Sequence, residues 1–213
     1  MPITRLCLVR HGETEWNAEG RVQGQTDVPL SAVGLAQAQA AAEVLYRHDF
    51  TAIYSSDLIR VRQTAEPSVR KLALPLQLDA ALRERHFGIF ERLLYTEVRS
   101  RYPEHYARFQ RKDPDYDFET GESLRVFHQR SLGAVKSIAE RHVGEQVLVF
   151  THGGVLEMVY RHARALGFSA PRDFGIPNCG VNWVEITTGG WDVQCWADIG
   201  HLSACDSVDD GGR

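Results

Sequence analysis

The chain has 213 residues and a formal net charge of −4, with 24 lysines and arginines against 28 aspartates and glutamates. A chain of this length can bury one good core, and no stretch looks like a linker, so we expect a single domain over residues 1–205. The mild acidic balance gives no reason to expect nucleic acid or an anionic membrane as a partner. No segment approaches the length of a membrane span, and the apolar run before Arg10 is too short for a signal peptide, so we expect a cytoplasmic protein.

The cysteines do not have the spacing of a metal site. They are Cys7, Cys179, Cys195 and Cys205. Cys7 and Cys195 fall in predicted strands, and no CxxC motif is present. We therefore expect buried free thiols in a reducing compartment.

Strands and helices are predicted to alternate along the first part of the chain. An apolar run predicts a strand over residues 3–9, and Ser31 is suited to cap an Ala-rich helix over residues 32–46. The elements expected next are a strand over residues 51–54, a helix over residues 57–72 and a short edge strand over residues 76–78.

The second part of the chain continues this alternation after an unclear stretch at residues 88–121. Helical spacing predicts a helix over residues 122–142. Its expected buried stripe is Leu124, Phe127, Leu132, Val135 and Ile138. The remaining predicted elements are a strand over residues 146–150, a helix over residues 155–166, and a β-hairpin of residues 182–186 and 192–196. The tail from residue 206 is acidic and Gly-rich, which predicts disorder. The pattern is that of an α/β fold with a mixed, mostly parallel sheet.

Two of the predicted strands end in the same way. One apolar run leads into Arg10, His11 and Gly12, and another leads into His152 and Gly153. Each strand therefore delivers one histidine at its carboxyl end, which is the edge where ligands bind in open α/β sheets. Either histidine alone is best explained as a solvent-side residue that ends a buried strand, whereas the two together suggest a functional site.

Histidines in this position serve as metal ligands, general bases or nucleophiles. The guanidinium of Arg10, next to His11, repels a divalent cation and attracts a phosphate, which it can hold with two hydrogen bonds. The local sequence therefore favours phosphate chemistry.

A longer motif extends this argument. The segment RHGETEWN at residues 10–17 resembles the signature of the histidine phosphatase superfamily, which includes the cofactor-dependent phosphoglycerate mutases. Further similar blocks follow in the family's order: RVQGQTDVPLS at 21–31, SSDLIR at 55–60, LRE at 82–84 and THGG at 151–154. This resemblance implies a three-layer α/β/α sandwich of the phosphoglycerate mutase type.

The resemblance also implies a mechanism. His11 would attack phosphorus and form a phosphohistidine that water then hydrolyses, without a metal or any other cofactor. Arg10, Arg60 and His152 would meet the charge on the phosphoryl oxygens, and Asn17 would donate a hydrogen bond to them.

The position of Arg60 fits this role better than that of a surface arginine. The helix dipole disfavours a cation in the first turn of a helix, so the position makes sense when the side chain points at an anionic ligand. Arg62, two residues further on, should face elsewhere and lie on the surface.

Glu84 would protonate the leaving oxygen and then activate water, a role that requires a carboxyl that is protonated part of the time. By local sequence alone it is a surface glutamate between two arginines. Gln23 and Gly24 would line the site, and backbone N–H groups near Gly12 and Gly153 would add hydrogen bonds.

The stretch at residues 92–121 argues against a mutase. The mutases carry a longer insertion here with paired arginines, whereas this stretch is shorter and has no adjacent arginines. Its aromatic residues Tyr102, Tyr106 and Phe109 belong either to a lid or to core packing.

We therefore predict a phosphatase acting on a small phosphorylated metabolite. The alternatives are a phosphoglycerate mutase or phosphotransferase and a non-catalytic phosphate-binding module. The edge strand at 76–78 also leaves open a homodimer, as in some relatives.

Overall fold

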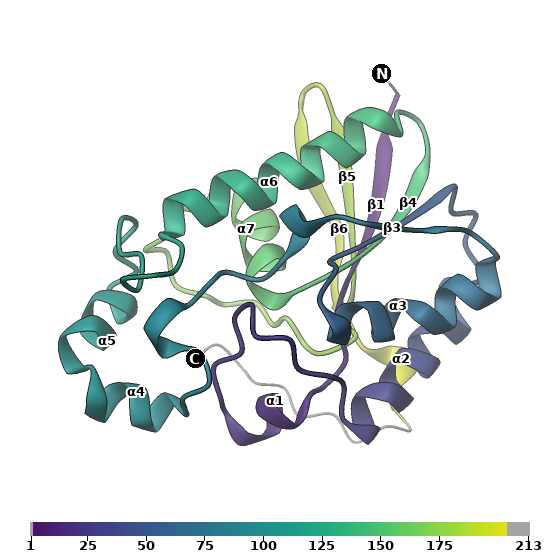
Figure 1. Ribbon diagram of the computed structural model, residues 1–213. Helices are drawn as coiled ribbons and strands as arrows, with labels where there is room; N and C mark the ends of the chain where they lie inside the picture. Colours follow the sequence, from purple (N-terminus) through teal and green to yellow (C-terminus); the bar gives the residue numbers. More distant parts are fainter. Residues whose placement is uncertain (1, 204–213) are drawn as a thin grey trace.

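The computed structural model describes residues 2–203, which form a six-stranded sheet flanked by helices (Figure 1). The strands lie in the order β3-β2-β4-β1-β5-β6. Their bounds are β1 (Thr4–Arg10), β2 (Ala52–Ser55), β3 (Leu76–Leu78), β4 (Gln146–Thr151), β5 (Val181–Thr187) and β6 (Gly190–Asp198). β1, β4, β2 and β3 run parallel, and the β5–β6 hairpin joins β1 in antiparallel fashion. The predicted mixed, mostly parallel sheet is confirmed.

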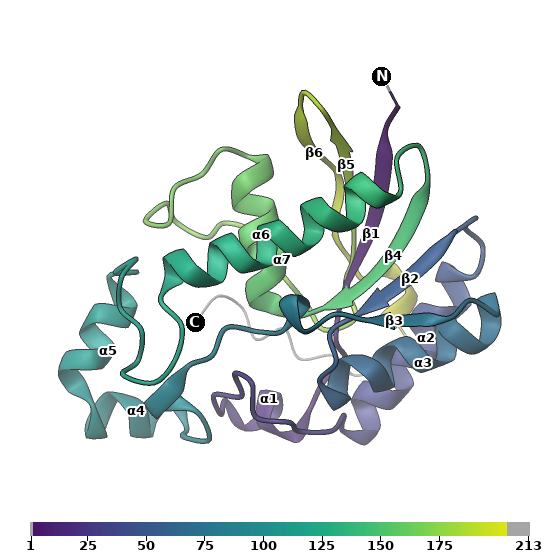
Figure 2. The same cartoon turned by 45° about the horizontal axis from the view of Figure 1, so that its top comes forward.

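Helices cover both faces of the sheet (Figures 1 and 2). Leu6 and Leu8 of β1 pack in the cluster that includes α6 (Leu124–Arg141) and α7 (Gly153–Ala163). Cys7 and Val9 pack on the opposite face with α2 (Ala32–Leu45) and α3 (Ile59–Leu72). Successive strand residues point to opposite faces, so an apolar run can fill two cores at once. The three-layer sandwich is therefore confirmed.

Polar caps set where the long helices begin. The Ser31 hydroxyl accepts a hydrogen bond from the Gly34 N–H at 3.1 Å, and Ser123 accepts one from the Val126 N–H at 3.2 Å. Ser123 is thus the residue before α6, and the helix begins at Leu124 rather than at residue 122. α7 begins two residues earlier than predicted, because the low helix propensity of Gly153 and Gly154 concealed its first turn.

The buried stripe of α6 differs from the prediction at one position. Leu132 is only partly buried, and Ser131 is fully buried in its place. The Ser131 hydroxyl donates to the Phe127 carbonyl at 2.8 Å, which satisfies its polar group inside the core.

Residues 87–121, which we call the cap, stand apart from the sheet. They contain η2 (Gly88–Phe90), α4 (Tyr95–Arg101) and α5 (Pro103–Gln110), and they follow the short turn η1 (Ala80–Leu82). Figure 1 shows α4 and α5 beside the short α1 (Glu15–Glu19), away from the strands. A separate apolar cluster holds the cap together, which we call the cap cluster: Val22, Phe90, Val98, Tyr116 and Phe118, with Tyr102, Tyr106 and Phe109 packed against it.

The cysteine prediction is right for two residues and wrong for one. Cys7 and Cys179 are free and buried, whereas Cys195 is free and exposed. Cys195 lies on β6, the edge strand whose pairing with β5 is irregular near Trp183, so its side chain is left uncovered. Cys205 and the predicted disordered tail lie outside the described residues, which end just after η3 (Gly200–Leu202). Within residues 2–203, no helix is long and apolar enough to cross a membrane.

Candidate active site

A pocket of about 450 Å³ lies at the carboxyl edge of the sheet, between the strands and the cap. Eight of the nine residues expected in the site line it: Arg10, His11, Asn17, Gln23, Gly24, Arg60, Glu84 and Gly153. The ninth, His152, is fully buried behind this wall. The structure therefore brings together side chains from five separate blocks of sequence.

Sheet register places the two histidines side by side. β1 and β4 pair in parallel with Arg10 opposite Thr151, so His11 and His152 are the next residues on adjacent strands. The backbone N–H of His11 donates to the Thr151 carbonyl at 2.9 Å. The ring centroids lie 5.3 Å apart at an interplanar angle of 65°.

The hydrogen bond of the His11 ring indicates which of its nitrogens carries the proton. Nδ1 lies 2.7 Å from the Gly12 carbonyl oxygen. A carbonyl only accepts, so Nδ1 must carry the proton, and Nε2 of the neutral ring keeps its lone pair. The Asn178 amide donates to the His11 carbonyl at 2.9 Å and so fixes the backbone of this residue.

His152 has both ring nitrogens engaged. Arg60 Nη2 lies 3.2 Å from Nδ1, and the Ser56 hydroxyl lies 2.9 Å from Nε2. Because a guanidinium only donates, Nδ1 accepts and Nε2–H donates to Ser56. Burial, together with the nearby charge of Arg60, lowers the pKa of His152 well below its ordinary value. His152 is therefore neutral here and adds no positive charge to the site, contrary to the expectation that it helps to meet the charge on a phosphoryl group.

Arg60 is a fully buried cation at the start of α3. Its Nη1 donates to the Thr26 carbonyl at 3.0 Å, and its Nη2 donates to the Gly24 carbonyl at 2.7 Å. Burial lowers its pKa to about 10, so the guanidinium is still charged at neutral pH. Arg62 is exposed, as predicted.

Gly24 contributes its backbone to this arrangement. Its φ of 52° lies in the left-handed region, and a Cβ there would collide with the Glu91 carboxylate. Only glycine occupies this position without strain, and in doing so it turns its carbonyl toward Arg60.

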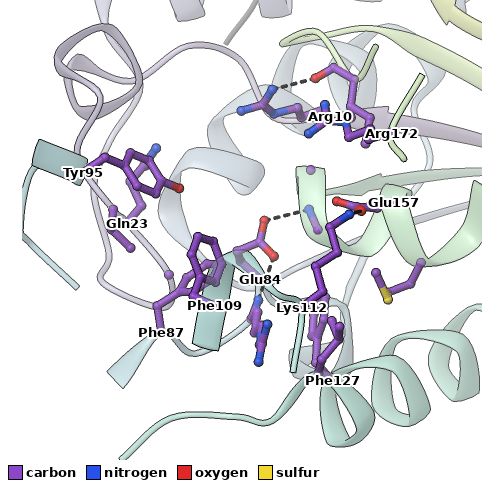
Figure 3. A pocket seen from close by; sticks show the side chains of 18 of the residues that line it. Arg10, Gln23, Glu84, Phe87, Tyr95, Phe109, Lys112, Phe127, Glu157 and Arg172 are labelled. Carbon is purple, nitrogen blue, oxygen red and sulfur yellow. Dashed lines mark hydrogen bonds and ion pairs between the residues drawn. The ribbon is translucent and has the colours of Figure 1, made fainter. Parts of the chain in front are cut away.

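Glu84 reaches into the pocket rather than into solvent (Figure 3). Its Oε2 accepts from the Gly154 N–H at 2.9 Å, and its Oε1 accepts from the Arg85 N–H at 2.7 Å. A Cβ on Gly154 would collide with the Glu84 carboxylate, so the glycine allows the carboxylate to lie against the start of α7.

Arg130 of α6 holds the loop that carries Glu84. Its guanidinium donates to the carbonyls of Ala81, Arg83 and Glu84 at 2.9, 3.0 and 3.1 Å. It also donates to Glu122 Oε2 at 2.6 Å. This role of Arg130 is not predictable from the sequence, because nothing in the local pattern of an amphipathic helix distinguishes this arginine from those that face solvent.

Only one of the two backbone N–H groups that were expected to bind a ligand points toward the pocket. The Gly12 N–H instead donates to the Thr64 hydroxyl at 2.9 Å, so the expectation that it would bind a ligand was wrong. Thr64 in turn donates to the Arg60 carbonyl at 2.7 Å, which ties the His11 loop to α3. Gly153, as the first residue of α7, still directs its N–H toward the pocket end of the helix.

Asn17 is oriented by the cap of α1. Its Oδ1 accepts from both the N–H and the hydroxyl of Thr14, each at 3.1 Å, which leaves the amide N–H groups as the donors of this pocket-lining side chain. Gln23 is about nine-tenths buried, lines the same pocket, and has no hydrogen-bond partner for its Oε1. Both are equipped to bind a polar ligand.

The pocket is also lined by charged residues that were not predicted from the sequence. They are Lys112, Glu157, Arg161 and Arg172. They come from the cap, from α7 and from the loop after it, and no shared motif links them. Ser56, by contrast, lay within one of the matched blocks and could have been identified there. Among residues 2–203, no group of three or more His, Cys, Asp or Glu side chains could hold a metal ion.

Comparison with known proteins gives consistent matches over the whole site. Residues 6–199 match the model of the histidine phosphatase superfamily, branch 1. A metal-independent phosphoserine phosphatase of Arabidopsis thaliana is 38% identical over 205 residues, covering 95% of this chain and 84% of the relative. Phosphoglycerate mutase-like protein 4 of the same plant is 40% identical over 201 residues, covering 92% and 86%. The solved structure of Bacillus stearothermophilus YhfR has a TM-score of 0.86 at 33% identity, covering 94% of this chain and all of that one.

Proposed function

The chain belongs to the histidine phosphatase superfamily, branch 1, and from this premise we propose that it is a metal-independent phosphatase of small phosphate monoesters. The observation that carries the proposal is the placement of His11. Its Nδ1 proton is held by the Gly12 carbonyl, and the ring lines a pocket together with Arg10 and Arg60. A neutral imidazole beside fixed cations is suited to attack a phosphate dianion.

The first step transfers the phosphoryl group to the protein. His11 Nε2 forms a bond to phosphorus while the bond to the ester oxygen breaks. Glu84, protonated in this step, gives its proton to the departing oxygen, which leaves as an alcohol. The product on the protein is a phosphohistidine.

The second step restores the enzyme. Glu84, now a carboxylate, takes a proton from a water molecule as the water oxygen attacks phosphorus. The bond from phosphorus to Nε2 breaks, inorganic phosphate leaves, and His11 and Glu84 return to their starting states. Glu84 is therefore the acid in one step and the base in the other.

The remaining site residues bind the phosphoryl oxygens. Arg10 and Arg60 supply positive charge, and Asn17, Gln23 and the N–H of Gly153 supply further hydrogen bonds. Arg10 is oriented by donation from Nη1 to the Ile176 carbonyl at 2.6 Å. Because the protein already holds these groups, little reorganisation is needed as charge develops. His152 acts behind them by holding Arg60.

Turnover with EDTA present tests the proposal. We expect release of inorganic phosphate from p-nitrophenyl phosphate, and its loss by about 10³-fold or more in His11→Ala. His162→Ala is the matched control, since this histidine is exposed on α7, outside the pocket. Conversion of 3-phosphoglycerate to 2-phosphoglycerate without net phosphate release would instead establish a mutase. Phosphate binding with no turnover of any ester would establish a binding module.

Three broader features also remain proposals. We infer that residues 1–205 act as one domain, that the protein is cytoplasmic, and that it forms a homodimer. The buried free thiol of Cys7 supports a reducing compartment. β3 lies at the edge of the sheet with Leu78 52% exposed, which supports pairing with a second copy. A monomer mass in sedimentation equilibrium would exclude the dimer.

A further inference from the structure

The wall of the pocket around Glu157 carries an excess of positive charge. Glu157 of α7 lies among Lys112, Arg161 and Arg172. Arg161 Nε donates to Glu157 Oε1 at 2.8 Å, and Lys112 Nζ lies 3.5 Å from the same oxygen. Figure 3 shows Lys112 reaching Glu157 from one side, with Arg172 on the other. Three cations thus surround one carboxylate.

Glu157 is ionised, so it cancels one of these charges. Burial by itself would raise its pKa, but the hydrogen bond from Arg161 and the charges of Lys112 and Arg172 hold the pKa below its ordinary value. The cluster therefore has a local charge of about +2. Arg10 and Arg60 already provide the counter-charge for a phosphate dianion. The net positive charge of the Glu157 cluster is therefore available to a second anionic group of the ligand.

The three cations are not equally available to a ligand. Arg161 is 1% exposed and is fixed by Glu157 and by the carbonyls of Gly167 and Ala170, at 2.9 and 3.0 Å. Lys112 is held only by the long contact to Glu157, and Arg172 donates to the Phe174 carbonyl at 3.2 Å. Lys112 and Arg172 are therefore the groups able to turn toward a ligand anion.

Glu84 and the charged cluster contact neighbouring parts of α7. Gly154, whose N–H donates to Glu84, precedes Glu157 by three residues, or roughly 4.5 Å of helix rise. A chain of two or three carbons from the ester oxygen covers such a distance. A bulky sugar or nucleoside is not required to reach the cluster.

We propose that Lys112, with Arg172, forms a subsite for a carboxylate on the leaving group, so that the preferred substrates are short phosphorylated carboxylic acids. This inference rests on the phosphatase function proposed above and narrows its substrate class. Lys112 lies in the cap, so a bound carboxylate also links the cap to α7. Lys112 is a specificity-determining residue in this view, and it takes no part in the bond-breaking steps.

Two pairs of substrates measure the effect of the carboxylate on turnover. O-Phosphoserine differs from phosphoethanolamine by this group alone, and 3-phosphoglycerate differs from glycerol 3-phosphate by a carboxylate in place of a hydroxymethyl group. We expect kcat/KM to favour the acid in each pair by roughly 10- to 100-fold, the range of a charge-assisted hydrogen bond. Lys112→Met should remove most of this preference, and Lys112→Glu should reverse it for the first pair. Arg111→Met, the matched control, removes an exposed cation outside the pocket and should keep the preference.

Two results would overturn the subsite. One is equal kcat/KM within each pair in the wild-type protein. The other is a loss in Lys112→Met of the same factor for acid and non-acid, which would mean that Lys112 only positions the cap. Calorimetric binding of the same pairs to His11→Ala separates this inference from the phosphatase proposal, because it needs no turnover. Tighter binding of the acids there supports the subsite even if p-nitrophenyl phosphate is not hydrolysed, and equal binding rejects it.

Discussion

His11 and His152 occupy equivalent places on neighbouring strands, yet their ring nitrogens have different surroundings. Nδ1 of His11 lies against the Gly12 carbonyl, whereas the ring nitrogens of His152 lie against Arg60 and Ser56. Because Arg60 can only donate, Nδ1 of His152 accepts from it, while Nδ1 of His11 donates to a carbonyl. The two rings therefore have opposite tautomers, and this difference supports the proposal that His11 attacks phosphorus while His152 holds Arg60.

Glu84→Gln tests the acid role at the residue scale. Glutamine keeps the size of the side chain but cannot give up a proton, so departure of a poor leaving group should suffer most. We expect kcat to fall by about 10²- to 10⁴-fold for an alkyl phosphate and far less for p-nitrophenyl phosphate. Steady-state kinetics on both substrates measures this. An equal loss on the two would remove Glu84 from the acid role.

At the scale of elements, the cap is a small structure with its own apolar packing. Phe90 and Phe118 are almost fully buried in the cap cluster, with ring centroids 5.0 Å apart. Arg85 links this cluster to the Glu84 loop: it donates to the Tyr116 carbonyl at 2.9 Å and lies 4.5 Å over the Phe118 ring. We therefore expect that the cap can loosen without loss of the sheet, and that loosening changes the pocket through Arg85.

Phe90→Ala tests this independence. The substitution should cost about 3 kcal/mol or more of packing free energy, and we expect the loss to fall on the cap. Hydrogen exchange should speed up in residues 87–121 while β1 and β4 stay protected, and kcat/KM should fall. Phe50→Ala, in the cluster on the α2–α3 face, is the control and should lower global stability without selectively affecting the cap. If β4 loses its protection from hydrogen exchange together with the cap, the cap and the sheet unfold as a single cooperative unit.

At the scale of the whole molecule, the buried neutral His152 ties folding to pH. Its pKa when folded lies well below the ordinary value of 6.5, so the unfolded chain binds more protons between these two values. The stabilisation is complete above pH 6.5 and is lost as the pH falls. His128 and His201, whose pKa values burial also lowers, act in the same direction.

We therefore expect the free energy of unfolding to drop between about pH 7 and pH 5.5, by up to about 1.4 kcal/mol per pH unit from His152. The carboxylates with lowered pKa values, such as Glu122 and Glu157, contribute only at lower pH, because their ordinary value is 4.5. Urea denaturation across this range measures the slope. His152→Gln should make it shallower, and an unchanged slope would show that the pKa of His152 is the same in the folded and unfolded chain.

Much of the fold follows from patterns between near neighbours in the sequence. The continuous apolar run of β1, the Ser31 cap and the Gly-containing hairpin turn each depend on residues a few positions apart. The errors arose where burial depended on distant packing. Leu132 lost its core position to Ser131, and Cys195 was left exposed on an edge strand with irregular pairing.

The sequence by itself determined the two strand-His-Gly units, the family blocks and most of the residues that line the candidate site, because these lie in short contiguous segments. Only the tertiary structure decided which ring nitrogen of His11 lies against a carbonyl and how Arg130 holds the Glu84 loop. It also decided that Lys112 meets Glu157, 45 residues away. The physical reason is that a hydrogen bond or ion pair depends on where two segments lie relative to each other. Local propensity and periodicity carry no record of that placement.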